Sequence, residues 1–174
     1  MVISLIREPV ARQISLMWHY FGENPKEMMK RYGKFENIER NFFQIPNRED
    51  EFEWYKKEME TVLGINVYEH SFDRDAGYSI IEKDGISLLL IKVEKLNSLE
   101  KVIADFLKED DFKLCNYNLA KEKNYRHAYN GYLREVKIPT EYMDYYYKDN
   151  PYMDHFYTKD EKQRFYDKWS KLVR

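Results

Sequence analysis

The run from Ile86 to Val93 constrains the fold more than any other part of the sequence, because only two polar residues interrupt it. Its centre, Leu88-Leu89-Leu90-Ile91, does not alternate between apolar and polar residues, which indicates a strand buried on both faces. Asp84 and Gly85 separate this run from another apolar stretch at residues 78–82, and an Asp-Gly pair between two apolar runs is typical of a β-hairpin. We therefore expect a hairpin whose second strand lies inside an α/β sheet.

Helical periodicity dominates the rest of the chain. A short apolar run at residues 2–6 predicts one more strand, and Pro9 after it suits the first turn of a helix. The pairs Asn97–Glu100 and Thr158–Glu161 have the spacing of capping boxes, which begin helices. Apolar stripes predict helices over residues 9–21, 47–64 (with Val62 on the stripe), 97–107, 118–136, 140–148 and 158–172. The expected fold class is α/β with helices in the majority.

Length, charge and composition exclude several classes of protein. A chain of 174 residues is expected to form a single domain over residues 1–174. Its formal net charge of −2 lacks the global basic field that attracts nucleic acid, and its longest apolar run is too short to span a membrane. Cys115 is the only cysteine, and His70, His127 and His155 share no metal-ligand spacing with one another or with nearby carboxylates. We therefore expect no disulfide, no metal, no nucleic-acid partner and a cytoplasmic location.

The segment from Arg7 to Ser15 predicts a phosphate site. Arg7 follows the first strand, and in an open α/β sheet ligands bind beyond the carboxyl ends of the strands. The start of the next helix would add free amide donors, and Ser15 a hydroxyl. Arg12, in the first helical turn, faces either the ligand or solvent. The alternative is a surface arginine and a helix serine bonded to its own backbone.

Other residues are candidates with a structural alternative. His19 lies one helical turn after Ser15 and could act as a base, although a partly buried structural histidine is the commoner case. Glu94 follows the buried strand and could contact acceptor hydroxyls, although a helix-capping role or an ion pair with Lys92 or Lys95 is the commoner case. Lys123, like Lys121, could reach a nucleotide phosphate or lie at the surface.

Tyrosine is abundant, with 16 copies in the chain, and it is crowded between Tyr142 and Tyr157. Tyrosine rings can stack on sugars or fill a core, because each joins an apolar ring to a polar tip. The spacing here is that of an ordinary amphipathic stripe, which favours core packing.

The string Arg7-Glu8-Pro9-Val10-Ala11-Arg12-Gln13-Ile14-Ser15 resembles the 3′-phosphate-binding motif of sulfotransferases that use 3′-phosphoadenosine-5′-phosphosulfate (PAPS). In that motif, an arginine after a strand and a serine eight positions later hold the 3′-phosphate of the donor. The rest of the chain is similar to a sulfotransferase-like family of capsular polysaccharide synthesis proteins. This second similarity lies in residues 89–97, 118–132 and 155–169.

These resemblances imply a P-loop NTPase/sulfotransferase-like fold and transfer of a sulfuryl group from PAPS to a sugar hydroxyl of a polysaccharide. Arg7, Arg12, Ser15 and Lys123 would then bind the nucleotide donor. His19 and Glu94 would lie on the side of the acceptor. The group that deprotonates the acceptor is not identified.

The sequence departs from the sulfotransferase pattern in one respect. Sulfotransferases carry a P-loop-like turn upstream of the arginine motif, and no glycine-lysine-serine turn occurs here. We therefore expect an incomplete sheet, the C-terminal portion of the family fold, that is inactive or very weak without a P-loop segment. The alternative is a non-catalytic remnant or interaction module that dimerises or binds a partner chain through an exposed sheet edge.

Overall fold

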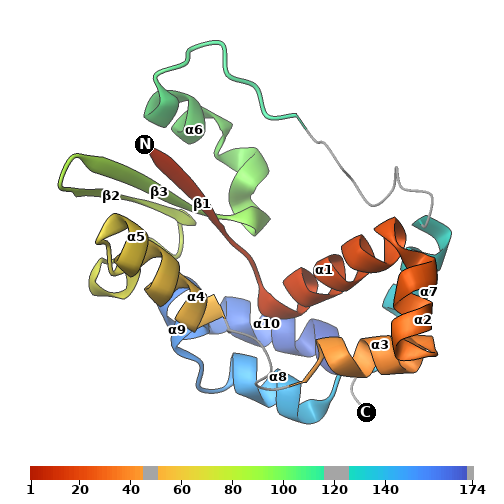
Figure 1. Ribbon diagram of the computed structural model, residues 1–174. Helices are drawn as coiled ribbons and strands as arrows, with labels where there is room; N and C mark the ends of the chain where they lie inside the picture. Colours follow the sequence, from red (N-terminus) through yellow and green to blue (C-terminus); the bar gives the residue numbers. More distant parts are fainter. Residues whose placement is uncertain (45–50, 116–125, 172–174) are drawn as a thin grey trace. The chain divides into compact units, whose positions relative to one another are not determined.

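The computed structural model describes residues 1–44, 51–115 and 126–171 (Figure 1). The chain divides into two compact units. The first comprises Met1–Arg7, Glu49–Cys115 and Pro151–Glu161, and the second Glu8–Arg48, Asn116–Asn150 and Lys162–Arg174. The expectation of one domain over residues 1–174 stays a prediction.

The first unit contains a three-stranded mixed sheet. Strands β1 (Val2–Ile6), β2 (Tyr78–Lys83) and β3 (Ile86–Lys92) lie in the order β1-β3-β2. β2 and β3 form the predicted hairpin, and Asp84 and Gly85 both have positive φ angles, of 48° and 78°. β1 runs parallel to β3, with Ile6 opposite Lys92. The central strand is buried as predicted, because residues 88–91 are at most 1% exposed.

Helix α6 (Glu100–Leu107) packs against this sheet, since Leu99 and Ile103 form one buried cluster with Leu89 and Ile91 of β3. The predicted capping box at Asn97 is wrong. Residues 93–98 form the 3₁₀ helix η3 (Val93–Ser98), so the chain is already helical at Asn97, and α6 has no side-chain cap. The Glu100 carboxylate accepts instead from the Leu114 amide at 2.9 Å.

A composite helix forms residues 51–63. It begins as α4 (Glu51–Tyr55), continues as the π-helix η1 (Lys56–Glu60) and ends as α5 (Thr61–Leu63) before Gly64 in the left-handed conformation. A π-helical turn holds more residues than an α-turn, so it rotates the residues that follow. Val62 is therefore 69% exposed, and its predicted place on the buried stripe is wrong. Asn47, the predicted cap, lies outside the described residues.

The first unit also contains the short helices η2 (Val67–Glu69) and α9 (Pro151–Phe156). An aromatic cluster packs α9 against η2 and α4. The Phe156 ring centroid lies 5.8 Å from that of Tyr68 in η2, 5.6 Å from Tyr55 in α4 and 5.1 Å from Phe72.

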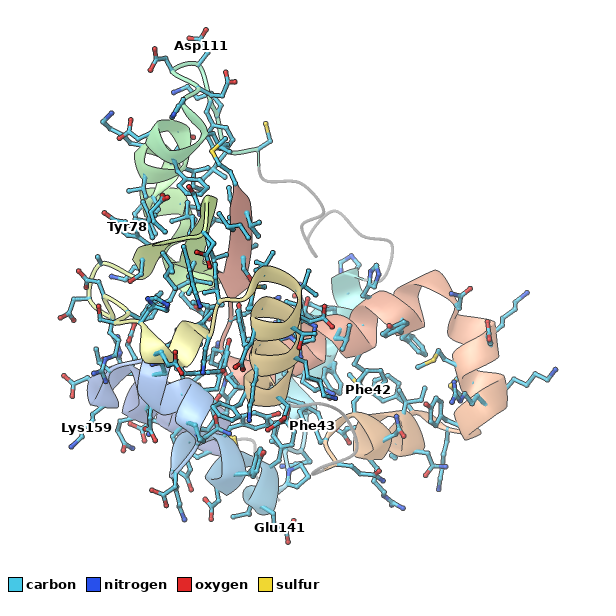
Figure 2. The ribbon with its side chains drawn as sticks, turned by 60° about the vertical axis from the view of Figure 1, so that its left-hand side comes forward. Phe42, Phe43, Tyr78, Asp111, Glu141 and Lys159 are labelled. Carbon is cyan, nitrogen blue, oxygen red and sulfur yellow. The ribbon has the colours of Figure 1, made fainter. Side chains whose placement is uncertain are left out.

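The second unit is helical. Its helices are α1 (Pro9–Glu23), α2 (Pro25–Tyr32), α3 (Phe35–Phe42), α7 (Arg126–Glu135), α8 (Thr140–Tyr147) and most of α10 (Lys159–Ser170). Trp18 of α1 contacts Tyr129 and Tyr132 of α7 edge to face. Phe43, which Figure 2 shows beside Phe42, stacks edge to face on Tyr142 at 5.1 Å. The first residues of the predicted helix 118–136 lie outside the described residues.

The expected fold class, α/β with helices in the majority, is confirmed. No helix in the described ranges is long and apolar enough to cross a membrane.

Candidate functional site at the carboxyl edge of β1 and β3

Two of the predicted site residues lie at one edge of the sheet. β1 and β3 are parallel with Ile6 opposite Lys92, so Arg7 and the residues just after Lys92 follow the carboxyl ends of neighbouring strands. This is the edge at which open α/β sheets bind ligands. The topology therefore brings Arg7 and Glu94, each of which was predicted to follow a strand, to the same edge.

Arg7 is held through its backbone. Its amide donates to the Tyr152 hydroxyl at 3.1 Å, and the same hydroxyl donates to the Arg7 carbonyl at 3.0 Å. The Arg7 side chain is half-buried. Within the described part of the chain, its guanidinium makes no hydrogen bond or ion pair. A guanidinium with its N–H groups in this condition can donate two parallel hydrogen bonds to an anion such as phosphate.

Glu94 lies in the first turn of η3 and is exposed. The Tyr157 hydroxyl donates to its carboxylate at 3.2 Å. Of the alternatives for Glu94, the ion pair with Lys92 is not the one that Lys92 forms, since its ammonium pairs with Glu161. The helix-capping role and the pairing with Lys95 stay predictions. Glu94 therefore keeps an exposed carboxylate at the sheet edge.

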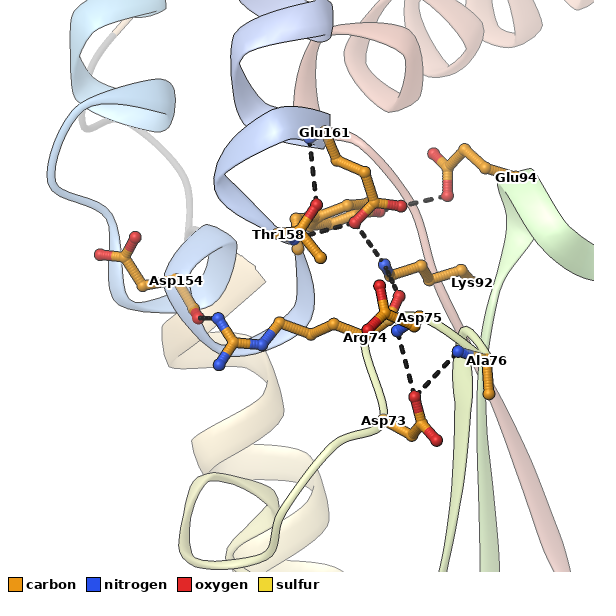
Figure 3. Close-up of polar contacts among 10 residues, drawn as sticks. Asp73, Arg74, Asp75, Ala76, Lys92, Glu94, Asp154, Thr158 and Glu161 are labelled. Carbon is orange, nitrogen blue, oxygen red and sulfur yellow. Dashed lines mark hydrogen bonds and ion pairs between the residues drawn. The ribbon is translucent and has the colours of Figure 1, made fainter.

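Lys92 ends β3 and is completely buried. Its Nζ donates to Glu161 Oε2 at 2.7 Å and to the Arg74 carbonyl at 2.8 Å (Figure 3). The same Nζ lies 4.7 Å from the centre of the Tyr157 ring. Burial lowers the pKa of Lys92, against the effect of Glu161.

Glu161 joins this ion pair to a helix start. The Glu161 carboxylate accepts from the Thr158 amide at 2.8 Å, and Thr158 Oγ1 accepts from the Glu161 amide at 3.2 Å (Figure 3). This confirms the predicted capping box. Burial acts to raise the pKa of Glu161, but hydrogen bonds from Lys92 and Thr158 hold it below its ordinary value. The capping spacing identified Glu161, whereas its contact with Lys92 joins residues 69 positions apart and left no local signal.

The remaining predicted site residues belong to the second unit or lie outside the described residues. Arg12 and Ser15 are half-buried on α1, and His19 is exposed on the same helix. Lys123 and Lys121 lie outside the described residues. The predicted roles of these residues stay predictions.

The start of α1 differs from the expectation of free amide donors. Glu8 caps this helix, and its carboxylate accepts from the amides of Val10 at 2.8 Å and Ala11 at 2.9 Å. The Tyr147 hydroxyl and the Trp169 indole N–H donate to the same carboxylate. Four donors thus converge on a side chain that is 1% exposed. The amides of Val10 and Ala11 are therefore not free to bind an anion.

The ionisation of Glu8 is expected to make stability depend on pH. Burial raises its pKa from 4.5 to about 7, although the hydrogen bonds and the nearby Lys168 charge oppose this. The folded state therefore binds the Glu8 proton more tightly than the unfolded state does. The stability that this proton adds is complete below pH 4.5 and is lost as the pH rises through 7. This contribution amounts to about 3 kcal/mol of unfolding free energy.

Urea denaturation at pH 5 and pH 8 measures this effect, with Glu8→Gln as the control. The glutamine cannot ionise, so the variant should show a smaller fall in stability between the two pH values. Equal falls in the wild type and the variant would contradict the assignment to Glu8.

The crowded tyrosines form part of the core, as their spacing predicted. Five of them are at most 7% exposed: Tyr142, Tyr146, Tyr147, Tyr152 and Tyr157. Their hydroxyls nevertheless make specific polar contacts, with Glu8, Arg7 and Glu94 among others. The sequence predicted the packing of the rings but not these contacts.

A model of the protein family described as "Putative capsular polysaccharide synthesis protein" (NKWYS) matches residues 28–158. The matched range contains Lys92, Glu94 and Tyr152, whereas Arg7 and Ser15 precede it. Comparison with the curated proteins and with the solved structures finds no match.

Proposed function

Because the chain belongs to the family of capsular polysaccharide synthesis proteins, we propose that it acts in that synthesis as a sulfotransferase-like protein that binds PAPS. The family supports the link to polysaccharide. The half-buried Arg7 at the carboxyl edge of two parallel strands carries the proposal of an anionic donor. With a formal net charge of −2, the chain offers no global attraction for anions, so a local arginine has to provide it.

The proposed reaction moves one sulfuryl group. The bond between sulfur and the bridging oxygen of the 5′-phosphate breaks, and a bond forms between sulfur and the acceptor hydroxyl oxygen. The acceptor proton passes to a base, and adenosine 3′,5′-bisphosphate leaves. In such a transfer, the protein mainly positions the donor and stabilises charge on the leaving phosphate.

The proposed roles follow the sequence pattern. Arg7 holds the 3′-phosphate with its guanidinium fork, and Arg12, Ser15 and Lys123 add donor contacts. Glu94 offers an exposed carboxylate to acceptor hydroxyls, and His19 is a second candidate on the acceptor side. The cytoplasmic location expected from the single cysteine is part of the same proposal.

Calorimetric titration of the chain with adenosine 3′,5′-bisphosphate tests the donor site. Arg7→Ala should weaken binding by about 10-fold to 100-fold, because a hydrogen-bonded charge pair contributes about 1.5–3 kcal/mol. Arg7→Lys should bind less tightly than the wild type but more tightly than the alanine variant, since lysine keeps the charge and loses the fork. Ser15→Ala should weaken binding by about fivefold.

Arg40→Ala is the matched control, because Arg40 is an exposed arginine on α3 outside the proposed site. It should bind like the wild type. Equal affinity of the Arg7→Ala variant and the wild type would overturn the assignment of Arg7. A folded wild-type chain that binds no adenosine 3′,5′-bisphosphate would overturn the proposed function and favour the non-catalytic alternative.

A further inference from the structure

A single tyrosine hydroxyl satisfies both backbone polar groups of Arg7. Tyr152 OH accepts the Arg7 amide hydrogen at 3.1 Å and donates to the Arg7 carbonyl at 3.0 Å. The two residues are 145 positions apart. Arg7 lies one residue beyond the last registered pair of β1 and β3, Ile6 and Lys92. The Tyr152 hydroxyl therefore bonds the first backbone groups beyond the last paired residues of β1 and β3.

The tyrosine is itself rigidly held. Tyr152 is 1% exposed and lies in α9. Its ring centroid lies 5.1 Å from that of Phe156, 6.0 Å from Tyr55 and 6.4 Å from Tyr157. A tyrosine has only two side-chain torsions, so a ring packed on several sides fixes the position of its hydroxyl. The backbone of Arg7 is bonded to a fixed point.

The direction of a side chain follows from its backbone. When both the N–H and the C=O of a residue are bonded to one hydroxyl, the backbone torsions of that residue are restricted. The Cα–Cβ bond of Arg7 then leaves the sheet edge in one direction, and the guanidinium samples a smaller volume. Preorganisation of this kind raises affinity by lowering the entropy that is lost on binding.

We propose that Tyr152 is a positioning residue that holds Arg7 in the orientation in which its guanidinium binds an anionic ligand. This inference rests on the proposed function of Arg7 and extends it to a residue that does not touch the ligand. The hydroxyl of Tyr152, and not its ring alone, is the group that acts.

Tyr152→Phe tests the inference, because it removes the hydroxyl and keeps the ring. The variant should bind adenosine 3′,5′-bisphosphate about tenfold more weakly than the wild type. Tyr55→Phe is the matched control. Tyr55 is also buried, and its hydroxyl bonds Ser4 Oγ at 3.2 Å and the Leu5 carbonyl at 3.1 Å, two residues before Arg7. The control should lose similar stability and keep its affinity within about twofold.

A double-mutant cycle separates positioning from a general loss of structure. If Tyr152 acts through Arg7, the Tyr152→Phe change should have no further effect on affinity in an Arg7→Ala background. Amide hydrogen exchange at Arg7, measured by NMR, should rise in Tyr152→Phe and not in Tyr55→Phe.

The outcomes distinguish the two proposals. Wild-type binding together with unchanged affinity in Tyr152→Phe would overturn the positioning role and leave the proposed function standing. The same tenfold loss in the Arg7→Ala background would also overturn the positioning role. A wild-type chain that binds no adenosine 3′,5′-bisphosphate would overturn the proposed function itself, and the positioning role with it.

Discussion

Replacement of Lys92 by methionine is expected to lower the free energy of unfolding by about 3–5 kcal/mol, the loss typical when one partner of a buried ion pair is removed. Methionine has a similar length and no charge. It would leave the Glu161 carboxylate without its cation and the Arg74 carbonyl without its donor, at a site where Lys92 is completely buried.

Urea denaturation followed by circular dichroism measures this loss. The double variant Lys92→Met, Glu161→Gln should recover part of it, because the glutamine is neutral and keeps an oxygen for the Thr158 amide. Lys101→Met is the control, since Lys101 pairs with Asp105 at 3.0 Å on the exposed face of α6. It should cost less than about 0.5 kcal/mol. If Lys92→Met lost no more unfolding free energy than the Lys101→Met control, the prediction would be contradicted.

Replacement of Glu8 by alanine should cost at least about 3 kcal/mol, because each buried donor that loses its acceptor costs about 1–3 kcal/mol. The amides of Val10 and Ala11, the Tyr147 hydroxyl and the Trp169 indole all lose their shared acceptor. The N-cap of α1 is lost in the same substitution.

Asp73→Ala is the matched control for Glu8→Ala. The Asp73 carboxylate also accepts from two backbone amides, those of Asp75 at 3.1 Å and Ala76 at 2.8 Å, but it lies in an exposed turn. Water can replace that acceptor, so the loss should stay below about 1 kcal/mol. Thermal or urea denaturation of both variants gives the comparison. Equal losses of unfolding free energy in Glu8→Ala and Asp73→Ala would show that burial does not make the hydrogen bonds to Glu8 more stabilising than those to Asp73.

The parts of the fold that the sequence predicted correctly are determined by residues close together in the sequence. The Asp84-Gly85 turn, the unbroken apolar strand and the capping box at Thr158 are all specified within a few positions. The errors arose where the local pattern changes its period. The π-helix η1 moves Val62 off the buried stripe, and η3 begins before the expected cap at Asn97.

The candidate site was predicted only in its outline. The sequence predicted that Arg7 and Glu94 each follow the carboxyl end of a strand, where ligands bind in open sheets, and the parallel pairing of β1 with β3 brings these two ends to one edge. Which groups hold these residues could not be predicted. Tyr152 lies 145 positions from Arg7, and Tyr157 lies 63 positions from Glu94. A sequence pattern identifies the residues of an edge, whereas their tertiary partners depend on how distant segments pack.

The double role of Glu161 affects how α10 opens. Helix ends normally fray, because their first amides and last carbonyls lack partners within the helix. Fraying of the first turn of α10 would separate Glu161 from Thr158 and also strip the buried Lys92 ammonium of its counter-ion. Opening of the first turn of this helix therefore also costs the loss of the buried Lys92–Glu161 ion pair. The Glu161 amide, which donates to Thr158 Oγ1, should exchange more slowly than a first-turn amide without an acceptor.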